Sequence, residues 1–156
     1  MSVAFRRESD EEHLEPKFEL PIPPGPNLVT PRGLALIEAR NAELEAAIAA
    51  ASPEALPELQ RDLRYWRARL ATAQLAPPAS GDVVALGTNV TIEQDATTRT
   101  LSIVGHDESD PATGRIAFAA PLAKALIGNE VDEQVDSLGP GGPITITAIE
   151  VQGDVS

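Results

Sequence analysis

The sequence has no cysteine and few histidine or aromatic residues. Without cysteine, its 156 residues offer no disulfide, no thiolate metal ligand and no cysteine nucleophile. One Trp, one Tyr and three Phe leave aliphatic side chains to build the core. Hydrophobic residues still make up 42% of the chain, so a folded core can form.

Long apolar segments are also absent. No apolar run approaches the ~20 residues that a membrane-crossing helix needs. The first residues, MSVAFRRESDEE, lack the apolar stretch of a secretory signal. We therefore expect a cytoplasmic protein with no membrane partner.

The charge is acidic and unevenly distributed, with a net value of −12. Residues 30–76 are neutral overall, whereas residues 77–156 carry three basic against twelve acidic side chains. A domain of this charge is repelled by a phosphate backbone, so no stable binding to free DNA is expected. Docking on a basic protein surface suits this charge better, and solubility alone is the alternative explanation.

Proline-rich segments divide the chain. PIPPGP at residues 21–26 ends a polar, aperiodic stretch, and APPASG at residues 76–81 forms a second break. The expected parts are a disordered extension (1–28), a helical hairpin (29–76), a linker (77–87) and a C-terminal domain (88–156).

Two stripes with heptad spacing flank the stretch AAASPEALPE at residues 49–58. Such stripes form the seam of a coiled coil, and the short connection makes the helices antiparallel. Thr30 and Pro31 supply an N-cap and a first-turn proline, while Pro57 limits where the second helix begins. The stripes consist of Leu34, Ile37, Asn41, Leu44 and Ile48, then Leu56, Leu59, Leu63, Trp66, Leu70 and Ala73.

Polar residues on these helices have a structural and a binding interpretation. Asn41 is expected to fix the register of the seam rather than bind a ligand, and Trp66 to anchor packing rather than stack on a base. Four arginines off the seam could meet an acidic partner, but pairing with neighbouring carboxylates is the favoured interpretation. They are Arg61, Arg64, Arg67 and Arg69, with Glu43, Glu45 and Asp62 as partners.

From residue 88 the hydrophobic period changes to two, which is typical of an antiparallel sheet with one face on a core. One short helix over residues 121–127 interrupts the strands and ends at Gly128. The fold class is therefore α+β: a helical hairpin followed by a small sheet domain with one helix. The alternating residues are Val90 and Ile92, Leu101 and Ile103, Ile116 and Phe118, and Ile144, Ile146 and Ala148.

Few residues could support catalysis. The sequence HDESD at residues 106–110 could attract a hard cation, but it lacks the ligand spacing and closing glutamate of a calcium loop. No zinc-protease motif and no glycine-rich phosphate loop before a helix occur. We expect no metal, no cofactor and no self-contained enzyme.

Three stretches together resemble the Gre family of bacterial transcript-cleavage factors, GreA and GreB. They are NLVTPRGLALIEARNAEL (27–44), SIVGHDESDPATGRIAFAAPLAKALIGNEVDEQV (102–135) and GPGG (139–142). The short helical arm is similar to that of the nucleoside diphosphate kinase regulators, a related branch. The resemblance implies an antiparallel coiled coil, a C-terminal domain similar to the FK506-binding prolyl isomerases, and RNA polymerase as partner. It also implies docking on the coiled coil at the rim of the polymerase secondary channel, with two acidic tip residues supporting a magnesium ion.

The chain departs from the family pattern at two places. At the arm tip, Ser52, Glu54 and Glu58 stand where the family has an acidic Asp-x-x-Glu-Asn stretch several turns further out, and each missing heptad withdraws the tip by ~10 Å. At the polymerase contact, Ala119, Ala120, Pro121 and Leu122 stand where the family carries Asp-Ser-Pro. We therefore expect a monomeric polymerase-binding regulator without cleavage stimulation. The alternatives are a cleavage factor that uses Glu54 and Glu58, and a prolyl isomerase or chaperone.

Overall fold

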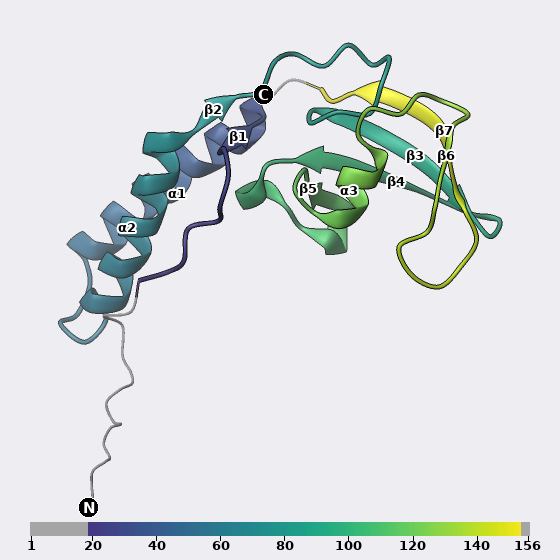
Figure 1. Cartoon of the computed structure of the whole chain (residues 1–156). Coiled ribbons are helices and arrows are strands. Elements are labelled where there is room, and N and C mark those ends of the chain that lie inside the picture. Colours follow the sequence, from purple (N-terminus) through teal and green to yellow (C-terminus); the bar gives the residue numbers. More distant parts are fainter. Residues whose placement is uncertain (1–18, 154–156) are drawn as a thin grey trace, which may run out of the picture. The chain divides into compact units, whose positions relative to one another are not determined.

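The computed structural model describes residues 19–153 and combines helices with a curled sheet (Figure 1). The helices are α1 (Pro31–Ala49), α2 (Leu56–Thr72) and α3 (Pro121–Leu126), with 3-10 turns η2 (His106–Glu108) and η3 (Pro111–Thr113). The strands are β1 (Leu28–Val29), β2 (Gln74–Leu75), β3 (Thr88–Gln94), β4 (Thr97–Val104), β5 (Arg115–Ala117), β6 (Gln134–Val135) and β7 (Ile144–Val151). No helix in this range is both long and apolar enough to span a bilayer.

The chain forms two compact units. The arm unit contains residues 37–72 and the segment that ends at Gly25, and the body unit contains residues 26–36 and the chain from Ala73 onwards. The first turn of α1 therefore belongs to the body unit. This division differs from the expected one, which assigned the whole of residues 29–76 to the hairpin.

In the arm unit, α1 and α2 lie side by side and are joined by residues 50–55 (Figure 1). Ile37, Leu44 and Leu63 are buried at the positions that the heptad spacing indicates. Asn41 is buried as well, and its Nδ2 donates to the carbonyl oxygens of Ile37 at 2.9 Å and of Trp66 at 3.0 Å. Asn41 thus joins the two helices through hydrogen bonds, in agreement with its expected structural role.

The stripe on α2 ends differently from the expectation. Leu70 is 37% exposed, whereas Arg69, expected on the solvated face, is only 3% exposed. The apolar stripe of α2 therefore does not continue into its last turn, where an arginine is buried in place of a leucine.

The body unit is built on a five-stranded sheet with the strand order β5-β4-β3-β7-β6. Most of the alternating apolar residues of the sequence supply its core, together with one face of α3. Ala148 is an exception, because the register of β3 and β7 shifts between Thr91 and Ile92, and Ile149 packs against the core instead. The fully or nearly buried members are Val84, Val90, Ile92, Leu101, Ile103, Ala123, Leu126, Ile144 and Ile146. The α3 helix ends as expected before Gly128, which has a φ of +92°.

The expectation of a purely antiparallel sheet is wrong, because β4 and β5 pair in parallel. After β4, residues 105–114 form η2 and η3 and carry the chain back, so that β5 runs in the same direction. A second, two-stranded parallel sheet pairs Leu28 with Gln74 and Val29 with Leu75. Dipeptide strands have too few residues to show alternation, so the sequence did not predict β1 and β2.

The segment expected as a linker, residues 77–87, contributes to the core. Val84 is fully buried, its N–H donates to the Asn129 carbonyl oxygen at 2.9 Å, and its own carbonyl accepts from Gly128 N–H at 2.8 Å. Of the expected disordered extension, residues 1–18 lie outside the described residues. Residues 19–28 are described, and Asn27 is buried in the body unit.

Candidate functional site

The arm tip contains the three residues that the sequence singled out. Ser52, Glu54 and Glu58 are all exposed. The α2 helix begins at Leu56, with Pro57 in its first turn, where the missing N–H costs little. Ser52 lies in the turn before the helix, where its carbonyl oxygen accepts from Ala55 N–H at 3.1 Å.

The two tip carboxylates have different surroundings. Glu54 lies in the turn, whereas Glu58 lies on the first turn of α2 with an oxygen 3.8 Å from Arg61 Nη2. Across residues 19–153, no group of three or more histidine or acidic side chains is placed to hold a metal ion. Glu54 and Glu58 are therefore not part of such a group in the described residues.

The expected polymerase contact lies at the start of α3. Ala119 and Pro121 are exposed, while Leu122 is half-buried against the sheet core. Ala120 is the N-cap of the helix and makes no side-chain capping bond. The surface here is apolar, and the helix start lacks the cap that a serine at position 120 would provide.

A buried carboxylate, Glu108, forms an unforeseen polar cluster in the body unit. Its side chain is 2% exposed; Oε1 accepts from Thr30 Oγ1 at 2.6 Å and Oε2 from Arg32 Nη1 at 2.9 Å. Thr30 also caps α1, since its Oγ1 accepts from Gly33 N–H at 2.9 Å. Glu108 therefore binds the first turn of α1 instead of contributing to a cation site.

The same region has one very close backbone approach. A Cβ atom on Gly105 would lie 2.5 Å from the Leu28 carbonyl oxygen, well inside van der Waals contact. Only glycine lets η2 approach β1 so closely. No local pattern indicated this contact or the Glu108 cluster, because each joins residues more than 70 positions apart.

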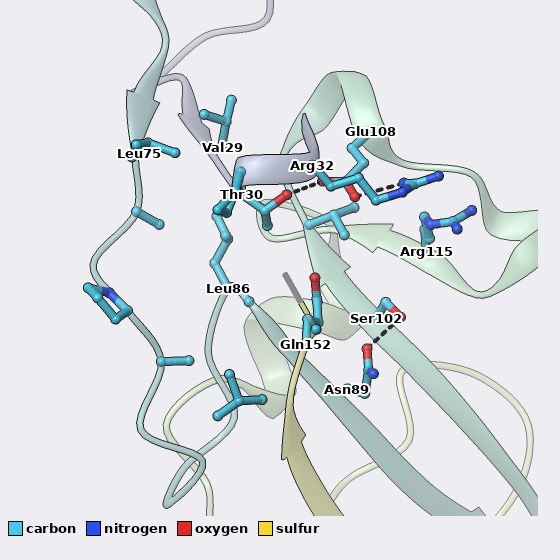
Figure 2. Close-up of a pocket in the computed structure, with 18 of the residues that line it drawn as sticks. Val29, Thr30, Arg32, Leu75, Leu86, Asn89, Ser102, Glu108, Arg115 and Gln152 are labelled. Carbon is cyan, nitrogen blue, oxygen red and sulfur yellow. Dashed lines mark hydrogen bonds and ion pairs between the residues drawn. The ribbon is translucent and has the colours of Figure 1, made fainter. Parts of the chain in front are cut away.

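The body unit also contains a pocket of about 570 Å³ (Figure 2). Figure 2 shows Val29 and Leu75 on one side, with Asn89, Ser102 and Arg115 on the other. Aliphatic side chains form most of the wall: Val29, Leu75, Pro77, Pro78, Leu86, Val104 and Val151. The sequence did not reveal this pocket, because its walls come from β1, β2, four strands of the main sheet and the segment after β2.

In the arm unit, Glu19 forms a two-point ion pair with Arg64. Its two carboxylate oxygens accept from Arg64 Nε at 2.8 Å and Nη2 at 2.7 Å. Hydrogen bonding from Arg64 holds the pKa of Glu19 below its usual range and in turn raises the pKa of Arg64. The expected partners hold for Arg61 with Asp62 and for Arg67 with Glu45, while Arg64 uses Glu19 instead.

Sequence comparisons relate the chain to transcription elongation factors. The profile described as "Transcription elongation factor, GreA/GreB, C-term" matches residues 78–152. GreB of Xanthomonas axonopodis pv. citri is 31% identical over 150 residues, which cover 80% of this chain and 89% of that protein. GreA of Legionella pneumophila is 40% identical over 96 residues, covering 58% of this chain and 59% of that protein. GreA of Thermomicrobium roseum is 42% identical over 77 residues, which cover 48% of this chain and 49% of that protein.

The extent of these matches varies. The chain spans about half the length of GreA from Thermomicrobium roseum and from Mesorhizobium japonicum. Among solved structures, GreA factor homolog 1 (Gfh1) of Thermus thermophilus aligns at 18% identity and a TM-score of 0.39, covering 80% of this chain and 99% of that one. GreA/GreB from Nitrosomonas europaea aligns at 21% identity and a TM-score of 0.41, covering 79% and 98%.

Proposed function

The chain belongs to the GreA/GreB family of transcription elongation factors, and on this premise we propose that it is a non-enzymatic regulator that binds RNA polymerase. It would dock as a monomer through the body unit at the rim of the secondary channel. Its regulatory effect would come from occupying that channel, where it competes with longer-armed factors. In this proposal the arm is a coiled coil and the body is similar to the FK506-binding proteins.

The proposed lack of cleavage stimulation rests on the position of the arm tip. The α1 helix has 19 residues, which correspond to ~28 Å. A tip several turns short cannot deliver a carboxylate to the reaction centre, and misplacing a catalytic group by ~1 Å can already cost ~100-fold in rate.

Two measurements test the proposal. Core polymerase should retain the purified protein in a pull-down at micromolar concentration, and stalled, backtracked complexes should show no additional RNA cleavage when the protein and magnesium are added. Absence of binding would refute the docking proposal. Cleavage that disappears in the Glu54→Ala, Glu58→Ala double variant would instead identify the protein as a cleavage factor.

The docking residues allow a gain-of-binding test. Changing Ala119→Asp and Ala120→Ser restores the polar residues that the family carries before Pro121. The double variant should bind polymerase more tightly than wild type, because both new side chains supply polar contacts. Ala120→Ser alone serves as the control for the added helix cap, which stabilises by ~1 kcal/mol without the charge.

A further inference from the structure

We propose that the pocket of the body unit binds an organic anion that consists of one aliphatic chain with a terminal carboxylate. The carboxylate would bind Arg115 and Asn89, and the chain would lie against Leu75, Leu86 and Val151. This site contains none of residues 119–122, so its test does not depend on polymerase docking.

The size and walls of the pocket suit such a ligand. Its volume of about 570 Å³ falls within the range of ligand pockets, ~300–1,000 Å³. Leu75 and Val151 line it although they are 57% and 51% exposed, so large aliphatic surfaces there remain in contact with water. An aliphatic chain in the pocket would cover these surfaces, and burial of apolar area favours binding.

The polar side of the pocket presents donors that lack acceptors. Within residues 19–153, the side chain of Arg115 has one hydrogen-bond partner, the Thr113 hydroxyl, which accepts from Nη1 at 2.9 Å. Asn89 Oδ1 accepts from Ser102 Oγ at 2.7 Å, whereas its Nδ2 has no acceptor in the same range. The remaining N–H donors of the Arg115 guanidinium and the Asn89 amide can therefore bind an acceptor on a ligand.

The charges select an anion with one negative charge. Glu108 neutralises Arg32, but no carboxylate among the described residues pairs with Arg115. The pocket thus has one uncompensated positive charge, although the chain as a whole has a net charge of −12. A carboxylate matches both this charge and the fork of guanidinium donors.

The composition of the wall also indicates which ligands do not fit. None of the described lining residues is aromatic. Nucleobases in open sites are commonly held by stacking on aromatic rings, so the pocket lacks the surface that a nucleotide would use. Proline, leucine and valine side chains instead favour an aliphatic chain.

The test is a titration of the full chain with octanoate, followed by calorimetry and by backbone amide chemical shifts. We expect saturable binding of one octanoate per chain, with shifts centred on residues 75–89, 102–104 and 115. Octanol and octyl phosphate are the comparison ligands. Octanol should bind at least ~10-fold more weakly, because it cannot form the charge-assisted bonds.

Three variants localise the interaction. Arg115→Gln should weaken octanoate binding by ~10-fold or more. Asn89→Asp keeps the acceptor for Ser102 but replaces the free donor with a negative charge, so it should weaken binding to a similar extent. Arg99→Gln is the matched control, since this exposed arginine of β4 lies outside the pocket, and it should leave the affinity unchanged.

Each contrary result overturns a part of the proposal. Absence of saturable shifts at the pocket refutes the site, and equal affinities of wild type and both pocket variants refute the polar contacts. Tighter binding of octyl phosphate than of octanoate refutes the carboxylate assignment. Amide spectra of the unliganded variants show whether each one retains the fold.

Discussion

Gly105 and Glu108 connect residues 28–33 to the sheet through two different kinds of contact. Gly105 permits a backbone approach that a side chain would block, and Glu108 supplies the acceptors for Thr30 and Arg32. Both residues lie on or next to η2, a single 3-10 turn. This short segment therefore positions the start of α1 on the body unit.

A methyl group at position 105 is expected to destabilise the body unit. In Gly105→Ala the Cβ meets the Leu28 carbonyl oxygen, and overpacking of this kind costs ~1–3 kcal/mol. Gly139→Ala is the control, because nothing lies within 4 Å of the corresponding Cβ. Urea unfolding measures the difference in stability between the two variants. Equal unfolding midpoints would show that β1 shifts to accommodate the methyl group at no cost in stability.

Loss of the negative charge at position 108 should also destabilise the protein. In Glu108→Gln the amide group must place a donor against either the Thr30 hydroxyl or the Arg32 guanidinium, so one of these two partners loses its acceptor. The expected cost is ~2 kcal/mol in the free energy of unfolding. Glu93→Gln on the exposed face of β3 should change this free energy by less than ~0.5 kcal/mol. A larger loss of stability in Glu93→Gln than in Glu108→Gln would contradict the structural role of Glu108.

At the scale of the elements, Asn41 holds the two arm helices through its amide nitrogen. Asn41→Asp replaces this donor with an acceptor that faces the carbonyl oxygens of Ile37 and Trp66. We expect a loss of ~2 kcal/mol or more in arm stability, because the buried group keeps no partner. The helical circular dichroism signal, followed during thermal unfolding, measures this loss of stability. Gln60→Glu, the same change at an exposed position of α2, should have little effect.

The ion pair between Glu19 and Arg64 predicts a pH dependence. The folded-state pKa of Glu19 lies below its usual range, so the pair stabilises the arm at pH values above the unfolded-state pKa. That contribution is lost as the pH falls through the lowered folded-state pKa. The effect on stability should be small, because both side chains are more than half exposed.

Carboxyl NMR titration gives a direct measurement of this pair. The titration midpoint of Glu19 should rise towards its usual range in Arg64→Gln, which removes the hydrogen-bond donor. Arg67→Gln, on the next turn of α2 and paired with Glu45, is the control. An unchanged Glu19 midpoint in Arg64→Gln would show that the pair does not persist in solution.

The elements that the sequence predicted are those with local signals. Heptad spacing located α1 and α2, the Thr30–Pro31 pair fixed the start of α1, and alternation located β3, β4 and β7. The parallel pairing of β5 could not be predicted, because three half-buried residues show neither direction nor partner. The structural role of Glu108 could not be predicted, since its partner Thr30 lies 78 positions away in the sequence. The pocket could not be predicted for the same reason, because residues far apart in the sequence line it.

At the scale of the whole molecule, the division into units predicts how the chain can be cut. Replacing residues 37–72 with a Gly/Ser linker of ~8 residues should leave the body unit folded, because β1, β2 and the Glu108 cluster remain. The fragment 78–153 lacks Thr30, Arg32 and both short strands, and it should be less stable by ~2 kcal/mol or more. Urea unfolding followed by sheet circular dichroism compares the two proteins. Equal stability would show that residues 26–36 are dispensable for the body.

The attachment of the first α1 turn to Glu108 also limits how arms can be exchanged between relatives. A chimaera spliced at the beginning of the helix would replace Arg32, and this carboxylate would keep its second donor only where the incoming turn also supplies one. A transplanted arm should instead be joined after Leu36 and before Ala73, where the division between the units falls. The exchangeable module is thus shorter than the helices from which it is made.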